Sequence, residues 1–564
     1  MGKKTVRYLL PIIHFILSFV YERSFLIFNA EDGVRMAIPR SDFYSDKAEH
    51  IVAYIISKIF AALLIFLVWK LLFYVFDHFK DTAVKVGLCV FIVLFVVFGV
   101  FLLTDVNLRS DDNYISYAYA LRLWPEYWHS AYLSTLYAGM MMVFPNPAAI
   151  GVIQWLGLSA VIGYAFNRID KSPVLKGRFK WLILLIFVLP NSYILTVDPY
   201  RTELYAIICM FFASLLVMDF VDQKERNAAE LALISVFAAF IAVFRSEGII
   251  LGLGGFVAAL IFGYKPGLKR IIAHTAFAVL AFLIILLPQK LGDKKYYGKD
   301  YTIINSFPSL INILNDGNHN IDYDGAEESL AAINRVVPLD IVSLYGMGGY
   351  HRHNIYCGRV DINQSYATDE EASAYVKGFY DLVFHNKKIY LKTQFVMWEQ
   401  SLFLRNEPFV AEPVGVTLTS PIADFKLDLW QDGKAEYIKN LHLQSWHDNS
   451  FRKKVAGFIS SVLNKVHDFS FNRIHAASAS LIVITLLSVI IMLKEFVLFF
   501  KKRRENTALG VFMLILLLQY AAIVIVMPAG AQVYFHATYY SMLIAEIAYI
   551  AKLIAERKAS KESL

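Results

Sequence analysis

Charged residues are scarce in this chain, at 18% of 564 residues. Soluble globular chains have about 25% charged and roughly 45–50% apolar residues. Here 57% of the residues are hydrophobic, 15% are aromatic, and the mean hydropathy is +0.50. An interior core alone does not need so many apolar side chains, so much of the surface must be apolar as well. This excludes a disordered chain and an ordinary cytosolic protein, and it indicates a protein surrounded by a lipid bilayer.

Cysteine is also scarce. The three cysteines are Cys89, Cys209 and Cys357, and the first two lie inside apolar runs. This number and placement exclude an intrachain disulfide framework and a zinc cluster. The net charge of +7 is concentrated in particular loops. It therefore predicts a membrane topology, and we expect no nucleic-acid partner.

Long apolar runs recur along most of the chain. A run of about 17 to 25 residues spans ~30 Å of hydrocarbon at 1.5 Å per residue. We therefore predict an all-α polytopic membrane protein with about twelve transmembrane helices. The first run contains Glu22 and Arg23, so it either spans the membrane or lies in the interface as an amphipathic helix. The predicted spans are 8–29, 51–76, 86–104, 148–166, 181–197, 204–220, 230–245, 248–263, 271–288, 476–499, 508–527 and 537–555.

The loops between these runs predict the orientation and the domains. Lys and Arg concentrate in one set of alternate loops and near both termini, which predicts a multi-pass protein of the cell membrane with both termini cytoplasmic. Residues 290–475 contain no spanning run and are numerous enough for a domain. We predict an N-terminal transmembrane region at 1–289 with an outer acidic loop at 105–147. An extracytoplasmic soluble domain at 290–475, mainly α or α+β, and C-terminal transmembrane helices at 476–564 follow.

The first cluster of charges on the predicted outer face lies in the acidic loop. It contains Asp105, Arg109, Asp111 and Asp112, and an aromatic segment at 113–144 follows that we expect to lie flat on the outer interface. One aspartate of such a pair suits a general base, while its neighbour binds a metal or positions the acceptor. The alternative is that the residues before the segment only cap its helix.

Two further clusters occur at tight outer turns. Asp198 precedes a proline and is typical of a helix start, whereas Arg201 and Glu203 lie in the first turn of the next span, where a phosphate or a metal would be met. Arg245 and Glu247 separate two apolar runs with almost no loop. They either satisfy each other as a buried salt bridge or line a polar cavity.

All three clusters fall on the same predicted side of the bilayer. Helix caps would be shared between both faces, so this convergence indicates one site on the extracytoplasmic face. His536, near the outer end of the last span, is a candidate contact for a lipid phosphate; the alternative is a plain interfacial histidine.

This arrangement resembles the GT-C class of membrane glycosyltransferases that use polyprenyl-phosphate sugars, such as protein O-mannosyltransferases and the aminoarabinose transferases of lipid A. The resemblance rests on Asp111 and Asp112 with Asp105 upstream, on the acidic turn from Asp198 to Glu203, and on the late outer domain. Two spans precede the one that leads into the acidic loop, whereas this loop usually follows the first span. The WWD-type motif of oligosaccharyltransferases is absent.

The resemblance implies transfer of a sugar from a polyprenyl-phosphate donor to an extracytoplasmic glycan, lipid or protein acceptor, with inversion at the anomeric carbon. Asp111 or Asp112 would be catalytic and take the proton of the acceptor hydroxyl. The donor phosphate would be bound by Arg109, Arg201, Arg245 and His536. Asp105, Asp198, Glu203 and Glu247 would bind a metal or position other groups. Mg²⁺ or Mn²⁺ on Asp112 and Glu203 is compatible with the resemblance, and so is a metal-free arginine version.

Two alternatives stay open at this point. An O-antigen polymerase or ligase also has many spans and a large outer loop, but it depends on arginines of that loop, so Asp112→Asn should leave it active. A lipid-linked-sugar transporter or flippase should instead carry charges at mid-membrane depth.

Overall fold

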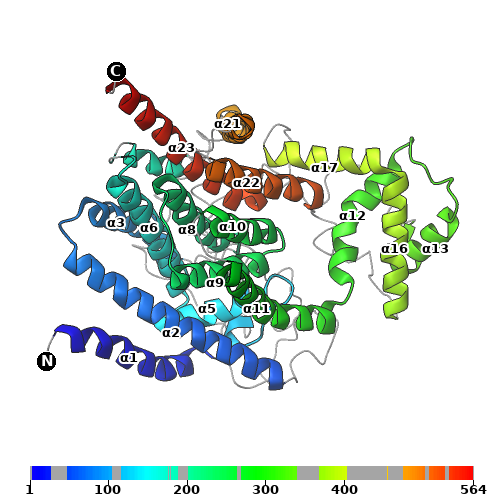
Figure 1. Ribbon diagram of the computed structural model, residues 1–564. Helices are drawn as coiled ribbons and strands as arrows, with labels where there is room; N and C mark the ends of the chain where they lie inside the picture. Colours follow the sequence, from blue (N-terminus) through cyan, green and yellow to red (C-terminus); the bar gives the residue numbers. More distant parts are fainter. Residues whose placement is uncertain are drawn as a thin grey trace.

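The computed structural model describes most of the chain, and within the described part every regular element is a helix (Figure 1). The described residues are 3–26, 47–104, 116–117, 119–175, 177, 179–188, 201–262, 268–339, 368–402, 454, 461, 474–501, 507–527 and 532–562. No strand occurs among them, so the predicted all-α fold is confirmed for these residues.

The helices follow one another closely along the sequence. Those of the N-terminal region are α1 (Lys3–Tyr21), the 3-10 turn η1 (Glu22–Ser24), α2 (Lys47–Asp77), α3 (Thr82–Thr104), α5 (Ala131–Val143), α6 (Ala148–Lys171), the 3-10 helix η3 (Lys180–Val188), α8 (Arg201–Asp222), α9 (Ala228–Phe244), α10 (Gly248–Phe262) and α11 (Leu268–Gly292). Those of the second half are the π-helical turn η4 (Asp293–Tyr297), α12 (Asp300–Asn315), α13 (Ala326–Val336), α16 (Asp369–His385), α17 (Lys387–Ser401), α21 (Ile474–Phe500), α22 (Thr507–Val526), the 3-10 turn η6 (Gln532–Phe535) and α23 (His536–Glu562).

Eight of the described helices are long and apolar enough to cross a membrane. These candidate spans are Thr5–Ser24, Ala48–Asp77, Ala148–Lys171, Arg201–Asp222, Ile271–Tyr296, Ala479–Phe500, Thr507–Val526 and His536–Arg557. Each overlaps a predicted span. The other four predicted spans coincide with the part Thr82–Val97 of α3, with the shorter apolar helices α9 and α10, and with η3. Several long apolar helices thus support a membrane-embedded protein, and the full set of twelve spans stays a prediction.

The charges that interrupt the first apolar run have partners on the next helix. α1 packs along α2, and Lys58 Nζ lies 2.5 Å from a carboxylate oxygen of Glu22, with both side chains 10% exposed. At the other end of the pair of helices, Arg7 lies 2.5 Å from Asp77. A carboxylate in apolar surroundings is tolerated when a cation is beside it. The charge at Glu22 is therefore compatible with a helix that lies in the membrane.

The aromatic segment after the acidic loop lies inside the molecule. Every residue of α5 is buried, and α5 packs against α1, α2, α6 and α11. Trp124 and Tyr137 are only 1% and 0% exposed. The expectation of an exposed interfacial platform at 113–144 is therefore wrong for the described residues of this segment, because their aromatic side chains pack against other helices.

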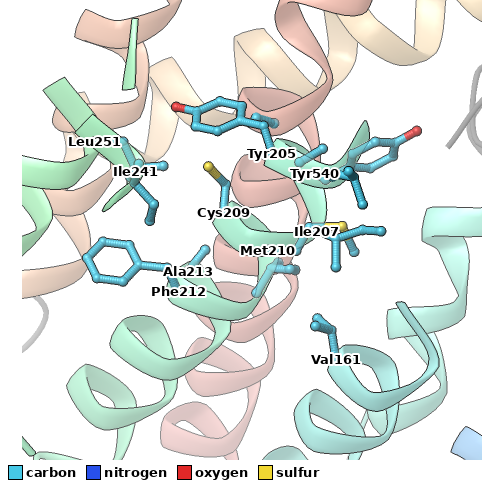
Figure 2. Close-up of a cluster of buried hydrophobic side chains, with 14 of the residues drawn as sticks. Val161, Tyr205, Ile207, Cys209, Met210, Phe212, Ala213, Ile241, Leu251 and Tyr540 are labelled. Atoms are coloured by element: carbon cyan, nitrogen blue, oxygen red, sulfur yellow. The ribbon is translucent and has the colours of Figure 1, made fainter. Parts of the chain in front are cut away.

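The centre of the bundle is α8. It packs against α6 on one side and along α23 on another, although α23 is more than three hundred residues later in the chain. Figure 2 shows the side chains of Tyr205, Cys209 and Phe212 on α8 among residues of the surrounding helices. These neighbours include Val161 of α6, Ile241 of α9, Leu251 of α10 and Tyr540 of α23. This apolar contact fixes the first turns of α8 and α23 relative to each other.

α9 and α10 form a tight hairpin because glycine lets their backbones meet. A Cβ atom on Gly248 would lie 2.1 Å from the carbonyl oxygen of Ile241, and one on Gly252 would lie 2.3 Å from that of Ala238. Small residues four apart permit such close helix packing in membranes. The hairpin holds the short turn that contains the third predicted cluster.

The predicted span at 181–197 begins as a 3-10 helix, η3. Its buried residues Ile183 and Ile186 are three positions apart, which matches the three residues per turn of a 3-10 helix. The packing of this face against α6 and α23 thus favours the tighter helix. Residues 189–197 lie outside the described part.

The described part of the predicted outer domain forms a second core. α12, α13 and α16 bury an apolar cluster of their own around Phe307, Ile333 and Tyr375. Tyr375 is completely buried and shares a hydrogen bond of 2.6 Å with Ser306, and its burial raises the pKa of its hydroxyl above the usual value. These helices lie at one end of the bundle, and both chain termini lie toward the other (Figure 1).

Candidate active site

Half of the predicted site residues fall within the described part of the chain. These are Arg201, Glu203, Arg245, Glu247 and His536. The other half lies outside the described residues and comprises Asp105, Arg109, Asp111, Asp112 and Asp198. The first cluster and the predicted helix start therefore remain predictions.

Glu203 and His536 form a buried pair. The Nδ1 atom of His536 lies 3.1 Å from Oε1 of Glu203, and Thr202 donates a hydrogen bond of 2.5 Å to Oε2. Glu203 is 0% exposed and His536 2%. Because a carboxylate only accepts hydrogen bonds, Nδ1 of His536 carries the proton. Within the described part of the chain, Nε2 of this ring has no hydrogen-bond partner.

Two elements position this pair. Glu203 lies in the first turn of α8, and His536 is the first residue of α23, directly after η6. Figure 2 shows the packing of Tyr540, one turn further along α23, near Ile207 of α8. The apolar contact between the two helices therefore holds the two polar side chains at its end.

Arg201, the first residue of α8, connects this helix to the segment before α5. One terminal nitrogen of its guanidinium donates a hydrogen bond to the carbonyl oxygen of His129. Its Nε is buried and has no hydrogen-bond partner among the described residues. A guanidinium with an unused donor, two residues before Glu203 in the first turn of α8, is a suitable group for binding an anion.

The residue whose carbonyl oxygen Arg201 contacts belongs to a second carboxylate–imidazole pair, which was not predicted from the sequence. His129 Nδ1 hydrogen-bonds to Oε1 of Glu126, whose other oxygen accepts a hydrogen bond from Ser116. The Glu126 side chain is fully buried and that of His129 is 6% exposed. The available signal was an ionisable pair three residues apart in an otherwise apolar, aromatic segment.

The turn between α9 and α10 lies beside these residues. Arg245 donates a hydrogen bond from Nε to Glu247, and their side chains are 4% and 10% exposed. Of the two alternatives open for this pair, the described contact is the buried salt bridge. The guanidinium of Arg245 also lies 5.8 Å from the ring centre of Tyr205 and 5.5 Å from that of Tyr534.

These aromatic contacts bring the second and third clusters together with His536. Tyr205 is two residues after Glu203, and Tyr534 is two residues before His536. Cation–π contacts at this distance are worth roughly 0.5–2 kcal/mol, the more when they are desolvated. The structure therefore gathers Arg201, Glu203 and His536 with the Arg245–Glu247 turn at one end of α8.

The described side chains do not form a metal site. No group of three or more His, Cys, Asp or Glu side chains among them could hold an ion. Both oxygens of Glu203 accept hydrogen bonds from Thr202 and His536, and those of Glu247 accept from Arg245 and Ser246. The described contacts of these two glutamates are with neighbouring side chains, and their predicted role in binding a metal or positioning other groups stays a prediction.

The imidazole and guanidinium groups of this site determine which chemistry it permits. It has two imidazoles oriented by carboxylates, one guanidinium with an unused buried donor, and a second guanidinium held between two aromatic rings. Oriented imidazoles transfer protons or donate to anions, and guanidinium groups bind phosphates.

Comparisons of the chain with protein-family models, with curated proteins and with solved structures found no match.

Proposed function

We propose that this protein is a membrane glycosyltransferase that moves a sugar from a polyprenyl-phosphate donor to an extracytoplasmic glycan, lipid or protein acceptor. The observation that carries the proposal is the buried Glu203–His536 pair, at the ends of two helices that are long enough to span a membrane, with Arg201 in the same first turn of α8. A buried cluster with unused donors at such a place suits a phosphate that arrives on a lipid.

The proposed reaction is a displacement at the anomeric carbon. The acceptor hydroxyl oxygen attacks this carbon, the bond from the carbon to the donor phosphate oxygen breaks, and its electron pair stays on the departing polyprenyl phosphate. The proton of the hydroxyl passes to the carboxylate of Asp111 or Asp112. Proton removal by a positioned carboxylate contributes typically 10²–10⁴-fold to the rate.

Positive charge at the leaving phosphate would be the main contribution of the described residues. Arg201 has a free donor at Nε, and His536 in its protonated form has a second N–H at Nε2 while Nδ1–H stays on Glu203. Such preorganised donors stabilise charge that develops in the transition state, at about 2.7–4 kcal/mol each in well-studied hydrolases. Arg245 would add to the positive potential, and Glu247 would hold it in place.

The decisive experiment is a donor panel. The purified protein is incubated with polyprenyl-phosphate sugars of different sugar and chain length, and the release of the lipid phosphate is measured. We expect turnover with at least one donor, its dependence on an acceptor hydroxyl, and its loss in Asp112→Asn. If the folded protein turns over none of the donors, the proposal fails.

A matched pair of variants tests the phosphate site separately. Arg201→Gln should raise the KM for the donor and lower kcat, because the guanidinium binds a phosphate whose charge grows in the transition state. Arg226→Gln is the control, since Arg226 is a buried arginine that is bound to Asp219 at the opposite end of α8. If the two variants changed KM and kcat equally, Arg201 would have only a structural role.

A second candidate function rests on a different observation. Glu546 of α23 and Glu495 of α21 are each 2% exposed between candidate spans, and they bond to Ser488 and Tyr549. Buried carboxylates within membrane helices are typical of proton or ion pathways in transporters. A transporter of lipid-linked sugars would translocate a labelled donor across proteoliposome membranes without releasing its phosphate, and this would distinguish it from the transferase.

A further inference from the structure

Helix α17, in the predicted soluble domain, exposes two large apolar side chains. Leu391 and Phe395 are 55% and 51% exposed, and they lie four residues apart on one face of the helix. The buried face is mixed, since the polar Thr393 and Gln394 lie there beside the apolar Val396 and Met397. A helix in water usually has polar residues on its outer face. The exposed strip of Leu391 and Phe395 therefore suits a contact with lipid.

The contacts of α17 place it beside a candidate membrane span. The hydroxyl of Tyr390 donates to the carbonyl oxygen of Ile525 at 2.9 Å, and Nε1 of Trp398 donates to the hydroxyl of Tyr520 at 2.6 Å. The later residue of α17, Trp398, thus contacts the earlier residue of α22, Tyr520. α17 is therefore antiparallel to the last turns of α22 and points into the bundle, as Figure 1 also shows.

The depth of this contact follows from helix geometry. The 20 residues of α22 measure about 30 Å, which equals the thickness of the hydrocarbon core. Tyr520 is six residues before Val526, so it lies about 9 Å inside that end of the span. Trp398 is hydrogen-bonded to it, and the C-terminal half of α17 must then share its depth.

The lysines of α17 lie toward its N-terminal end. Lys387 and Lys388 occupy its first turn and Lys392 follows one turn later, whereas the remaining residues up to Ser401 contain one charged residue, Glu399. Lysines near the interface extend their ammonium groups toward the lipid phosphates. The exposed Leu518 and Ile525 of α22 continue the apolar surface beyond α17.

We infer that α17 is embedded in the leaflet in which α22 ends, with the acyl chains of membrane lipids against Leu391 and Phe395 and the lipid phosphates near Lys387 and Lys388. The predicted outer domain is thus anchored in the bilayer through α17. This inference does not depend on the proposed function. It is compatible with the expectation that 290–475 contains no spanning segment, because the 15 residues of α17 enter one leaflet only.

The embedded helix also reaches the candidate active site. Trp398 bonds to Tyr520, whose hydroxyl lies 3.1 Å from that of Tyr539 and whose ring packs on Phe535. Phe535 precedes His536 in the chain. α17 is therefore linked to the start of α23 through Tyr520.

The test measures lipid contact in the full-length protein. Single cysteines are introduced by Phe395→Cys, Leu518→Cys and Ser373→Cys into a variant without native cysteines, labelled with a fluorophore and reconstituted with phosphatidylcholine that carries bromine on its acyl chains. Leu518 is the lipid-facing reference on α22, and Ser373 is an exposed residue of α16. We expect the bromines to reduce the fluorescence at Phe395→Cys as strongly as at Leu518→Cys, and not at Ser373→Cys. If Phe395→Cys behaves like Ser373→Cys, the inference is overturned.

A second measurement needs no substitution. A phosphatidylcholine with a photoreactive diazirine on its acyl chain is activated in proteoliposomes of the unaltered protein, and the labelled peptides are identified by mass spectrometry. Labels on residues 389–395 support the inference. Labels on α22 without any on α17 would overturn it.

Discussion

The Glu203–His536 pair gives the most direct test of the proposed site. In Glu203→Gln the side chain keeps its size, but the negative charge that stabilises a protonated imidazole is lost. Glu203 is 0% exposed, so no water replaces the lost interaction. A hydrogen bond to a charged group is worth about 1.5–3 kcal/mol, and about 1.4 kcal/mol is a factor of ten in rate. We expect the release of lipid phosphate to fall by about 10- to 150-fold.

The assay compares initial rates at saturating donor with the melting temperature of the same preparation. Glu230→Gln is the matched control, because Glu230 caps α9 through a backbone contact that an amide oxygen can also make. This control should keep its activity. The double variant Glu203→Gln/His536→Ala should lose no more activity than His536→Ala alone, since two residues that act as one unit are not additive.

Two outcomes would refute this reasoning. The first is unchanged turnover in a folded Glu203→Gln variant, which would mean that the charge of Glu203 does not act on His536 during the reaction. The second is a double variant whose losses multiply, because the two residues would then act independently.

Three further predictions concern other parts of the fold. Gly252→Ala should lower the melting temperature and reduce the free energy of unfolding by about 1–3 kcal/mol, because the added Cβ would lie 2.3 Å from a carbonyl oxygen of α9. Gly157→Ala is the control and should be neutral or stabilising, because its Cβ would lie 3.7 Å from the nearest atom. Lys58→Met should lower the free energy of unfolding by about 3 kcal/mol, because it leaves the carboxylate of Glu22 without its cation. In a denaturation assay, the double variant Lys58→Met/Glu22→Gln should recover most of this lost stability. Glu546→Gln should leave sugar transfer unchanged if the protein is a transferase, whereas a proton-coupled transporter would lose uptake in the proteoliposome assay.

Much of the fold could be predicted because a bilayer imposes a strong constraint on sequence. Apolar runs of sufficient length located α2, α6, α8 and α22, for example, to within a few residues. Helix ends were less accurate, since α6 continues to Lys171 and α11 to Gly292, beyond the apolar residues. The hydrogen bonds of a helix continue where its side chains become polar, so hydropathy alone ends it too early.

The site was predictable in its residue types and only partly in its contacts. The charged turns identified Arg201, Glu203 and Arg245, because charges beside apolar runs are unusual. The contact of Glu203 with His536, which joins residues 333 apart, depends on how α8 packs on α23 and has no local signal. The Glu126–His129 pair lay in a segment interpreted as interfacial, so its burial was not expected.

The lengths of α9 and α10 have a consequence for the lipid around the protein. Their 17 and 15 residues measure about 26 and 23 Å, which is less than the ~30 Å of an average hydrocarbon core. A hairpin with this mismatch, spanning the membrane as predicted from the sequence, would thin the adjacent bilayer or draw its headgroups inward. Water and lipid phosphates would then come close to the Arg245–Glu247 turn below the average membrane surface. In the proposed transferase, a donor on a long hydrocarbon tail would bring its phosphate to this turn without leaving the bilayer.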